Sequence, residues 1–174
     1  MTRVGDPGNE VRKEKSMKRV AIFVDVQNVY YTTKQTFNRH FDYNAFWTEA
    51  TYNRKIVKAI AYAIDRGDEK QRHFQRILRG IGFEVKLKPY IQRSDGSSKG
   101  DWDVGITIDV LEYAKKCDVV VLVSGDGDFA ILMDRIKKDF GVSVEIYGVK
   151  KLTADLLIHT ASDFKPINNN LLLQ

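Results

Sequence analysis

The feature that most constrains the fold of this chain is a set of short aliphatic runs, each followed by a polar or helix-like segment. The clearest run, VVVLV at residues 119–123, contains no polar side chain. A strand of this kind is typical of parallel sheets that are covered by helices on both faces. Similar runs occur at residues 19–25 and 142–147. We therefore predict an α/β fold, a three-layer sandwich with a mainly parallel central sheet.

The predicted strands and helices alternate along most of the chain. Residues 56–64 (IVKAIAYAI) fit either a strand or a buried helix, and we favour a strand. Residues 94–100 (SDGSSKG) are typical of a loop. The strands are expected at residues 19–25, 56–64, 83–90, 119–123 and 142–147, and the helices at residues 28–35, 43–52, 68–80, 104–116, 129–140 and 152–162. The side chains expected to face the core from the helix at 104–116 are Val104, Ile108, Leu111 and Ala114.

Length and composition indicate a single domain preceded by a short tail. The 174 residues suit one compact domain, and no run approaches the roughly 20 apolar residues that span a bilayer. Residues 1–16 are polar and charged, so we expect a flexible tail there and the folded domain at residues 17–174. A single cysteine, Cys117, and the lack of a signal-peptide pattern favour a cytoplasmic location. The net charge of +5 is compatible with a nucleic acid partner.

Acidic residues follow the predicted strands at the places where ligands bind in parallel sheets. Asp25 ends the first strand, and Asp126 and Asp128 follow the strand at residues 119–123. Because parallel strands share their carboxyl edge, these residues are expected at one rim of the sheet. Asp103 stands at the start of the helix that leads into this strand, and the amino end of that helix is expected at the same rim.

Two explanations account for these carboxylates. Asp101 and Asp128 stand at helix starts, where an aspartate cap contributes about 1 kcal/mol. Asp25 and Asp126 have no evident capping task, and a buried carboxylate is costly unless it is paired. A bound cation is the simplest way to offset repulsion among several carboxylates. Oxygen ligands favour Mg²⁺ or Mn²⁺ over Zn²⁺.

Three short motifs resemble those of a known family. They are D-V-Q-N at residues 25–28, K-G-D-W-D-V at 99–104 and S-G-D-G-D-F at 124–129. They are similar to the D-x-x-N, K-G-x-x-D-V and S-G-D-x-D-F motifs of NYN domains, LabA-like branch, in the PIN-like nuclease superfamily. The resemblance covers residues 18–166, and the three motifs in this order are specific where each alone is modest. It implies a PIN-like fold and a metal-dependent nuclease.

The resemblance also implies roles for individual residues. Asp109 matches an acidic position, but six residues after Asp103 on a helix it cannot point the same way. It is therefore expected behind the direct metal ligands or partly in solvent. The residues implied to be catalytic and to bind the metal are Asp25, Asp103, Asp126 and Asp128. Those implied to contact the substrate are Asn28, Lys99 and Ser124.

The expected substrate is RNA, in single-stranded form. One or two metal ions would activate a water molecule and stabilise charge on the scissile phosphate. Basic and aromatic side chains near the predicted rim suit phosphates and unpaired bases; they are Lys86, Lys88, Tyr90, Arg93 and Trp102. The lysines could equally mark the solvated face of a strand, and Trp102 could pack in the core. Tyr30 and Tyr31 are expected to pack within the fold.

Other functions on a similar sheet fit less well. A haloacid-dehalogenase-type enzyme needs a second aspartate where this chain has Gln27, and a response-regulator receiver needs an acidic pair where Val26 follows Asp25. The G-x-G-x-x-G turn of dinucleotide-binding folds does not follow the first strand. The alternative that remains is a non-catalytic RNA-binding or protein-interaction module that retains the PIN-like fold. RNA cleavage would distinguish it from a nuclease.

Overall fold

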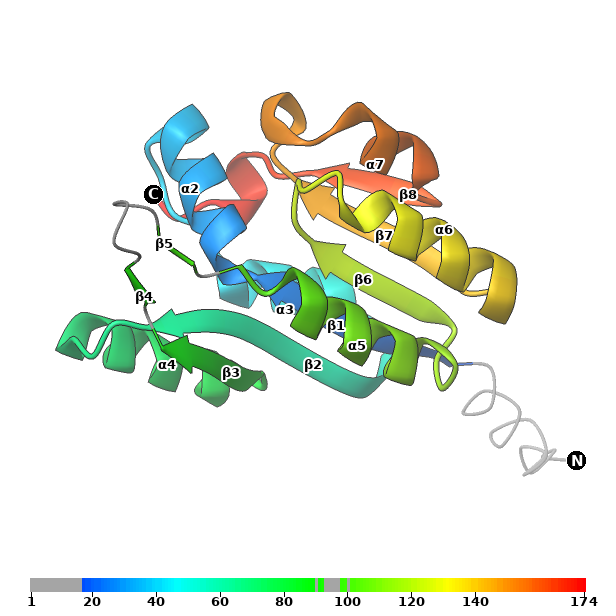
Figure 1. The fold of residues 1–174 in the computed structure, drawn as a ribbon, viewed down its shortest axis with the longest axis horizontal. Coiled ribbons are helices and arrows are strands. Elements are labelled where there is room, and N and C mark those ends of the chain that lie inside the picture. Colours follow the sequence, from blue (N-terminus) through cyan, green and yellow to red (C-terminus); the bar gives the residue numbers. More distant parts are fainter. Residues whose placement is uncertain (1–16, 90, 93–97, 100) are drawn as a thin grey trace, which may run out of the picture.

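The computed structural model describes residues 17–89, 91, 92, 98, 99 and 101–174. Its centre is a six-stranded sheet of order β3-β2-β1-β6-β7-β8, in which every neighbouring pair is parallel (Figure 1). The strands are β1 Lys18–Asp25, β2 Arg54–Asp65, β3 Glu84–Pro89, β6 Val119–Val123, β7 Ser143–Gly148 and β8 Asp163–Pro166. A small antiparallel ribbon pairs β4 Ile91–Gln92 with β5 Ser98–Lys99. The predicted α/β sandwich with a mainly parallel sheet is confirmed.

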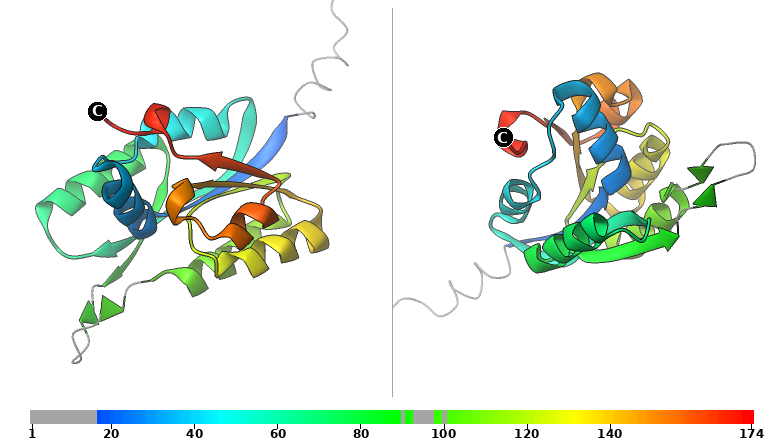
Figure 2. Two further views of the ribbon diagram at one scale, coloured as in Figure 1. Left: turned by 90° about the horizontal axis from the view of Figure 1, so that it is seen from above. Right: turned by 90° about the vertical axis from the view of Figure 1, so that its left-hand side faces the viewer.

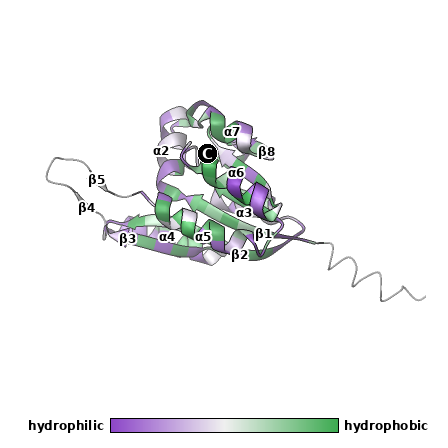
Figure 3. Ribbon diagram, turned by 45° about the vertical axis from the view of Figure 1, so that its right-hand side comes forward, coloured by the Kyte–Doolittle hydropathy of each residue, from purple (hydrophilic) through white to green (hydrophobic). Residues whose placement is uncertain are grey.

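Helices cover both faces of the sheet (Figure 2). Their buried side chains form two hydrophobic cores with those of the strands. Along β1, Val20, Ile22 and Val24 join the first core, whereas Ala21 and Phe23 join the second. This alternation is the normal period of a strand, and all five side chains are fully buried because β1 lies inside the sheet. Burial on both faces explains why the middle strands are almost continuously hydrophobic (Figure 3).

The helices divide between these two cores, and the strands end at the edge where α2 and α5 begin (Figure 1). Those of the first core are α2 Val26–Phe37, α3 Tyr43–Thr51 and α4 Glu69–Ile81; those of the second are α5 Asp103–Ala114, α6 Phe129–Phe140 and α7 Asp155–Thr160. The Asp68 side chain caps α4 by accepting a hydrogen bond from the Gln71 backbone N–H at 2.8 Å. No helix in the described part of the chain is long and apolar enough to cross a membrane.

The secondary structure predicted for residues 56–64 and 152–162 can be compared with the observed elements. The ambiguous residues 56–64 belong to a strand, β2, as favoured, and β2 pairs in parallel with β1 and β3. The helix predicted at residues 152–162 is confirmed at Asp155–Thr160 (α7) and wrong at both ends, because a 3₁₀ turn at Lys150–Leu152 precedes α7 and β8 follows it. The four residues of β8 are half-buried or exposed, so this edge strand has no alternating apolar pattern to reveal it. The predicted tail at residues 1–16 lies outside the described residues.

The face of α5 that enters the core differs from the predicted one. Val104 and Ile108 are 71% and 60% exposed, and Leu111 is exposed as well. The side chains of α5 that join the second core are Ile106, Val110 and Ala114, of which only Ala114 was predicted. The reason is that α5 carries apolar residues on nearly all sides, so hydrophobic periodicity alone does not select a face.

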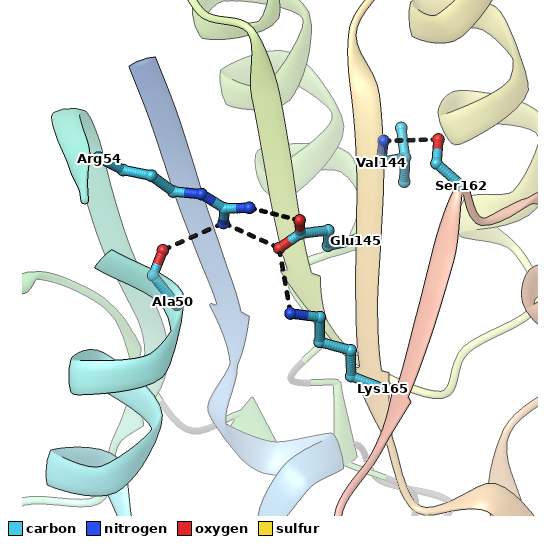
Figure 4. A network of polar contacts seen from close by, with 6 residues as sticks. All are labelled: Ala50, Arg54, Val144, Glu145, Ser162 and Lys165. Atoms are coloured by element: carbon cyan, nitrogen blue, oxygen red, sulfur yellow. Dashed lines mark hydrogen bonds and ion pairs between the residues drawn. The ribbon is translucent and has the colours of Figure 1, made fainter. Parts of the chain in front are cut away.

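A network of charged side chains joins β2, β7 and β8 on the face of the sheet that carries the first core (Figure 4). The Arg54 guanidinium donates to both oxygens of Glu145, at 2.9 and 2.5 Å, and to the Ala50 carbonyl of α3 at 3.2 Å. Lys165 places its ammonium 3.9 Å from the same carboxylate. Burial acts to raise the pKa of Glu145, but the Arg54 and Lys165 charges hold it below its ordinary value. Glu145 is therefore stabilised as a buried carboxylate.

Candidate metal centre

Asp25 lies where β1 passes into α2. Its side chain is 8% exposed and accepts hydrogen bonds from the Asn28 backbone N–H at 3.4 Å and the Ser124 hydroxyl at 3.3 Å. It therefore caps α2, contrary to the expectation that it has no capping task. Burial raises the pKa of Asp25 to about 6, with repulsion from Asp126 and Asp101 adding to the rise, while its two hydrogen bonds lower it.

The loop between β6 and α6 is held in place through the first motif. The side-chain oxygen of Asn28 accepts a hydrogen bond from the Gly125 backbone N–H at 2.9 Å. Within the loop, the Ser124 hydroxyl accepts from the Asp126 N–H at 3.2 Å, and Asp126 accepts from the Asp128 N–H at 2.9 Å. These contacts join two segments that are about one hundred residues apart in the chain, and they orient the acidic loop towards the edge of the sheet.

Three carboxylates from two segments converge at this edge. Asp103 begins α5, and Asp126 and Asp128 precede α6. One oxygen of each lies within 4.8 Å of those of the other two. The acids that pair with lysines and arginines in the described ion pairs are other residues, namely Glu69, Glu84, Asp109, Asp118, Asp134, Asp139 and Glu145. We call Asp103, Asp126 and Asp128 the carboxylate cluster, and Asp25 joins it through Ser124 rather than directly.

The crowding of these carboxylates changes their protonation. Burial is the largest of the effects that raise the pKa of Asp103 to about 7. A hydrogen bond with the Asp126 carboxyl and repulsion from Asp126, Asp101 and Asp25 add to the rise. Without a cation, the neutral form of Asp103 is therefore favoured over a wider pH range than for an ordinary aspartate. A divalent cation would reverse this preference, and a set of oxygen donors fits Mg²⁺ or Mn²⁺. The residues present therefore fit such an ion.

The residues predicted to contact substrate differ in how accessible they are. The prediction that Ser124 contacts the substrate is corrected by its burial. The residue is 1% exposed, and its hydroxyl donates a hydrogen bond to Asp25 and accepts one from the Asp126 N–H. It therefore positions these two residues and is not accessible to a substrate. Asn28 is half-buried, and its contact with substrate stays a prediction. The side chain of Lys99 lies outside the described part of the chain, so its role also stays a prediction.

Asp109 is buried on α5 and held by two partners. It is 8% exposed and accepts hydrogen bonds from the Tyr62 hydroxyl and the Lys86 ammonium, both at 2.8 Å. The alternative that it lies partly in solvent is therefore wrong, and its support of the metal ligands stays a prediction. Lys86, considered for phosphate contact, is the ion-pair partner of Asp109. No pattern in the sequence indicated Tyr62, because it lies within the apolar run of β2.

Trp102 packs against the sheet. This supports packing in the core, and not stacking on bases, as its role. Its indole N–H donates to the Ala63 carbonyl at 2.8 Å, and its ring lies 5.3 Å from that of Tyr62. Lys88 covers the indole at 4.6 Å from the ring centroid and donates to the Asp101 carbonyl. These contacts fix the start of α5, and with it Asp103. Tyr90 and Arg93 fall outside the described residues.

Comparisons with known proteins identify the family. The NYN domain model matches residues 19–168. The chain belongs to the NYN domain family. The resemblance to its LabA-like branch is confirmed by 30% identity over 120 residues to Low amplitude and bright protein LabA of Synechococcus elongatus. That match covers 64% of this chain and 63% of LabA, so the chain spans somewhat less than two thirds of its relative.

A solved structure also resembles this NYN domain along nearly its whole length. It is the crystal structure of a protein of unknown function from Vibrio parahaemolyticus, which is 55% identical in sequence. The two superpose with a TM-score of 0.86, covering 90% of this chain and 97% of the other. NYN domains belong to the PIN-like nuclease superfamily, and the parallel sheet with its acidic edge is consistent with that fold.

The raised pKa values predict how pH affects metal binding by the NYN domain. An aspartate in an unfolded chain has a pKa near 4, so between about pH 4 and pH 7 the folded, metal-free domain binds more protons than the unfolded one. The contribution of Asp25 and Asp103 to its stability is therefore expected to fall as pH rises through this range. Because Mn²⁺ competes with these protons, the gain in melting temperature on adding Mn²⁺ should be larger at about pH 8 than at about pH 5.

Thermal unfolding with and without Mn²⁺, at both pH values and constant ionic strength, measures this difference. A gain that is the same at both pH values would show that Mn²⁺ does not bind at Asp25 and Asp103.

Proposed function

We propose that this NYN domain is a divalent-metal-dependent ribonuclease that hydrolyses phosphodiester bonds in single-stranded RNA. The proposal depends on one observation above all: oxygens of Asp103, Asp126 and Asp128 converge at the carboxyl edge of the sheet. Family membership supports it, since NYN domains belong to a nuclease superfamily. A module that only binds RNA has no need to gather carboxylates where phosphates approach, because like charges repel.

The carboxylate cluster would hold Mg²⁺ or Mn²⁺, with Asp25 as a further ligand beside it. A bound divalent cation supplies Lewis acidity towards the scissile phosphate and lowers the pKa of a bound water molecule. The chain itself supplies the arrangement of the ligands. Ser124 links Asp25 to the Asp126 backbone, and Asn28 holds the same loop from α2. The donor oxygens are thus positioned by hydrogen bonds before the substrate binds.

A cytoplasmic location and a nucleic acid partner are part of the same proposal. Cys117 is buried and unpaired, which suits a reducing compartment. The net charge of +5 favours association with a polyanion. Both observations are general, so the proposed activity depends on the carboxylate cluster and not on them.

Cleavage of a fluorescently labelled single-stranded RNA tests this function. Shorter fragments are expected with Mn²⁺ or Mg²⁺, and none with EDTA, because the carboxylates alone lack the Lewis acid. A DNA strand of the same sequence and an RNA duplex show which substrate is preferred. If the protein binds Mn²⁺ yet cleaves none of these substrates, the ribonuclease proposal fails, and a non-catalytic RNA-binding or protein-interaction module is favoured.

A further inference from the structure

A groove with a volume of about 960 Å³ lies next to α2 at the carboxyl edge of the sheet. Its walls are formed by α2, the start of α3, the end of β2 and α4. Figures 1 and 2 show the arrangement of these elements around the start of α2. We call it the α2–α4 groove. None of the residues of the carboxylate cluster lines it, so it is a second feature of this edge.

One face of α2 turns aromatic and polar side chains towards the groove. Gln27, Tyr30, Tyr31 and Lys34 line it, and their spacing of three and four residues places them on one side of the helix. Tyr30 is 43% exposed and Tyr31 is 51% exposed, so the prediction that they pack within the fold is wrong. Exposed aromatic rings in a groove are available for stacking on a flat ligand.

The first turn of α2 connects the groove to the proposed metal centre. Gln27 lines the groove only two residues after Asp25. Asn28, the next residue, accepts a hydrogen bond from Gly125 in the loop that carries Asp126. Neighbouring residues of one helical turn thus reach the groove and the acidic loop. A ligand that occupies both has to pass over this turn, as a polymer chain can.

Two exposed lysines at the groove are suited to an anionic ligand. Lys34 and Lys70 line it, are exposed, and form no ion pair with any described residue. The acidic side chains that line it are already engaged in helix caps or ion pairs; they are Asp42, Asp68 and Glu69. The Lys34 ammonium also lies over the Tyr30 ring, 5.8 Å from its centroid, but the side chain is exposed. Both ammonium groups can therefore reach phosphates, whose counterions they would release.

We propose that the α2–α4 groove binds unpaired nucleotides of the RNA strand beside the cleavage site, with a base stacked on Tyr31 and phosphates near Lys34 and Lys70. This inference rests on the proposed ribonuclease function. Stacking requires an unpaired base, so the groove selects single strands over duplexes. Tyr30 supports the Tyr31 ring, since their centroids lie 5.5 Å apart in an edge-to-face contact and His40 stacks on Tyr30 at 5.7 Å.

Binding measured in the absence of catalysis tests the groove. A fluorescein-labelled single-stranded RNA is titrated with the full chain in EDTA, and fluorescence anisotropy reports the dissociation constant. Tyr31→Ala is expected to weaken binding about tenfold, as for the loss of one base–aromatic stack, and Tyr31→Phe to bind like the wild type. Tyr52→Ala is the matched control, because Tyr52 is 73% exposed near the amino end of β2, at the opposite edge of the sheet, and no change is expected.

A second variant tests the ionic part of the same site. Lys34→Ala is expected to weaken binding and to reduce the slope of log affinity against log salt concentration by about one. Melting temperatures establish that each variant folds, and an RNA duplex serves as the second ligand. The loss of affinity caused by Tyr31→Ala should be found with single-stranded RNA and not with the duplex.

The outcomes separate the groove from catalysis. If Tyr31→Ala and Tyr52→Ala bind single-stranded RNA equally well, the groove inference is overturned even where the wild type cleaves RNA. If the duplex loses as much affinity as the single strand, base stacking on Tyr31 is overturned. If Tyr31→Ala weakens binding but no metal supports cleavage, the groove inference stands and the ribonuclease proposal does not.

Discussion

Replacing Asp126 with asparagine is expected to lower the rate of RNA cleavage by on the order of a hundredfold or more. Loss of a residue that only supports a metal ligand costs about 10- to 100-fold in affinity or activity, so loss of a ligand should cost at least as much. The change removes one negative charge from the cluster with Asp103 and Asp128 and leaves a neutral amide. Cleavage time courses at a fixed Mn²⁺ concentration measure the effect. The pKa of Asp103 should also fall, because Asp126 raises it.

Asp163→Asn provides the matched control for this substitution. Asp163 is exposed and begins β8, an outer strand that β7 separates from β6, which leads to Asp126 and Asp128. The variant changes the net charge by the same amount and is expected to cleave RNA at the wild-type rate. Equal losses in both variants would assign the effect to net charge, and full activity of Asp126→Asn would remove Asp126 from the proposed metal centre.

Replacing Arg54 with alanine is expected to lower the free energy of unfolding by about 3 kcal/mol. Breaking a buried ion pair costs about 3–5 kcal/mol because it leaves an uncompensated charge, and Lys165 keeps the loss near the lower end. Arg54 and Glu145 have side chains that are only 18% and 11% exposed, so water cannot easily replace the lost partner. Urea unfolding at neutral pH measures the difference.

Arg19→Ala is the matched control for Arg54→Ala. Arg19 pairs with Asp118 at 3.3 Å, but both side chains are about half exposed, and such surface pairs contribute about 0–1 kcal/mol. The pH provides a second check. Since the pKa of Glu145 is lowered from 4.5, the stability that its pairing contributes is present above that pH and is lost as pH falls through the lowered value. A penalty for Arg54→Ala that stays constant well below pH 4.5 would contradict the role of this pair.

The position of the candidate site could be predicted because it follows from strand ends. β1 and β6 are aliphatic runs, and the first ends in Asp25 while the second leads into the loop with Asp126. Once both strands are parallel neighbours, their carboxyl ends have to meet. The motif at residues 99–104 added Asp103 at the start of α5. The alternation of strands and helices along the chain predicts such parallel strands.

Tertiary contacts determined what the residue pattern could not predict. The hydroxyl of Ser124 turns inward to Asp25, and this orientation depends on how the loop packs against α2. A serine in an acidic motif gives no sign of it. The buried face of α5 was wrong for a related reason: Val104 and Ile108 are as apolar as Ile106, and only the packing on the sheet distinguishes them. Hydrophobic patterns identify an element better than they identify its partners.

The tyrosines of α2 show a similar limit. Tyr30 and Tyr31 were expected to pack, because aromatic residues are usually buried at least in part. The helix instead buries Val29 and Thr33, which also line the groove, and leaves the two tyrosines exposed there. The groove itself involves α2, α3, α4 and β2, which are joined only in the folded chain. A binding surface assembled from several elements is therefore not visible in the residue order.

The position of Mn²⁺ in a soaked crystal tests most directly whether the carboxylates at the sheet edge form a metal centre. Anomalous scattering is expected to locate an ion in contact with oxygens of Asp103 and Asp126, with Asp25 or Asp128 completing the set at metal–oxygen distances of about 2.0–2.3 Å. The signal should be lost in Asp126→Asn crystals and kept in Asp163→Asn crystals. An ordered cluster with no ion at saturating Mn²⁺, or an ion bound elsewhere, would contradict the proposed metal centre.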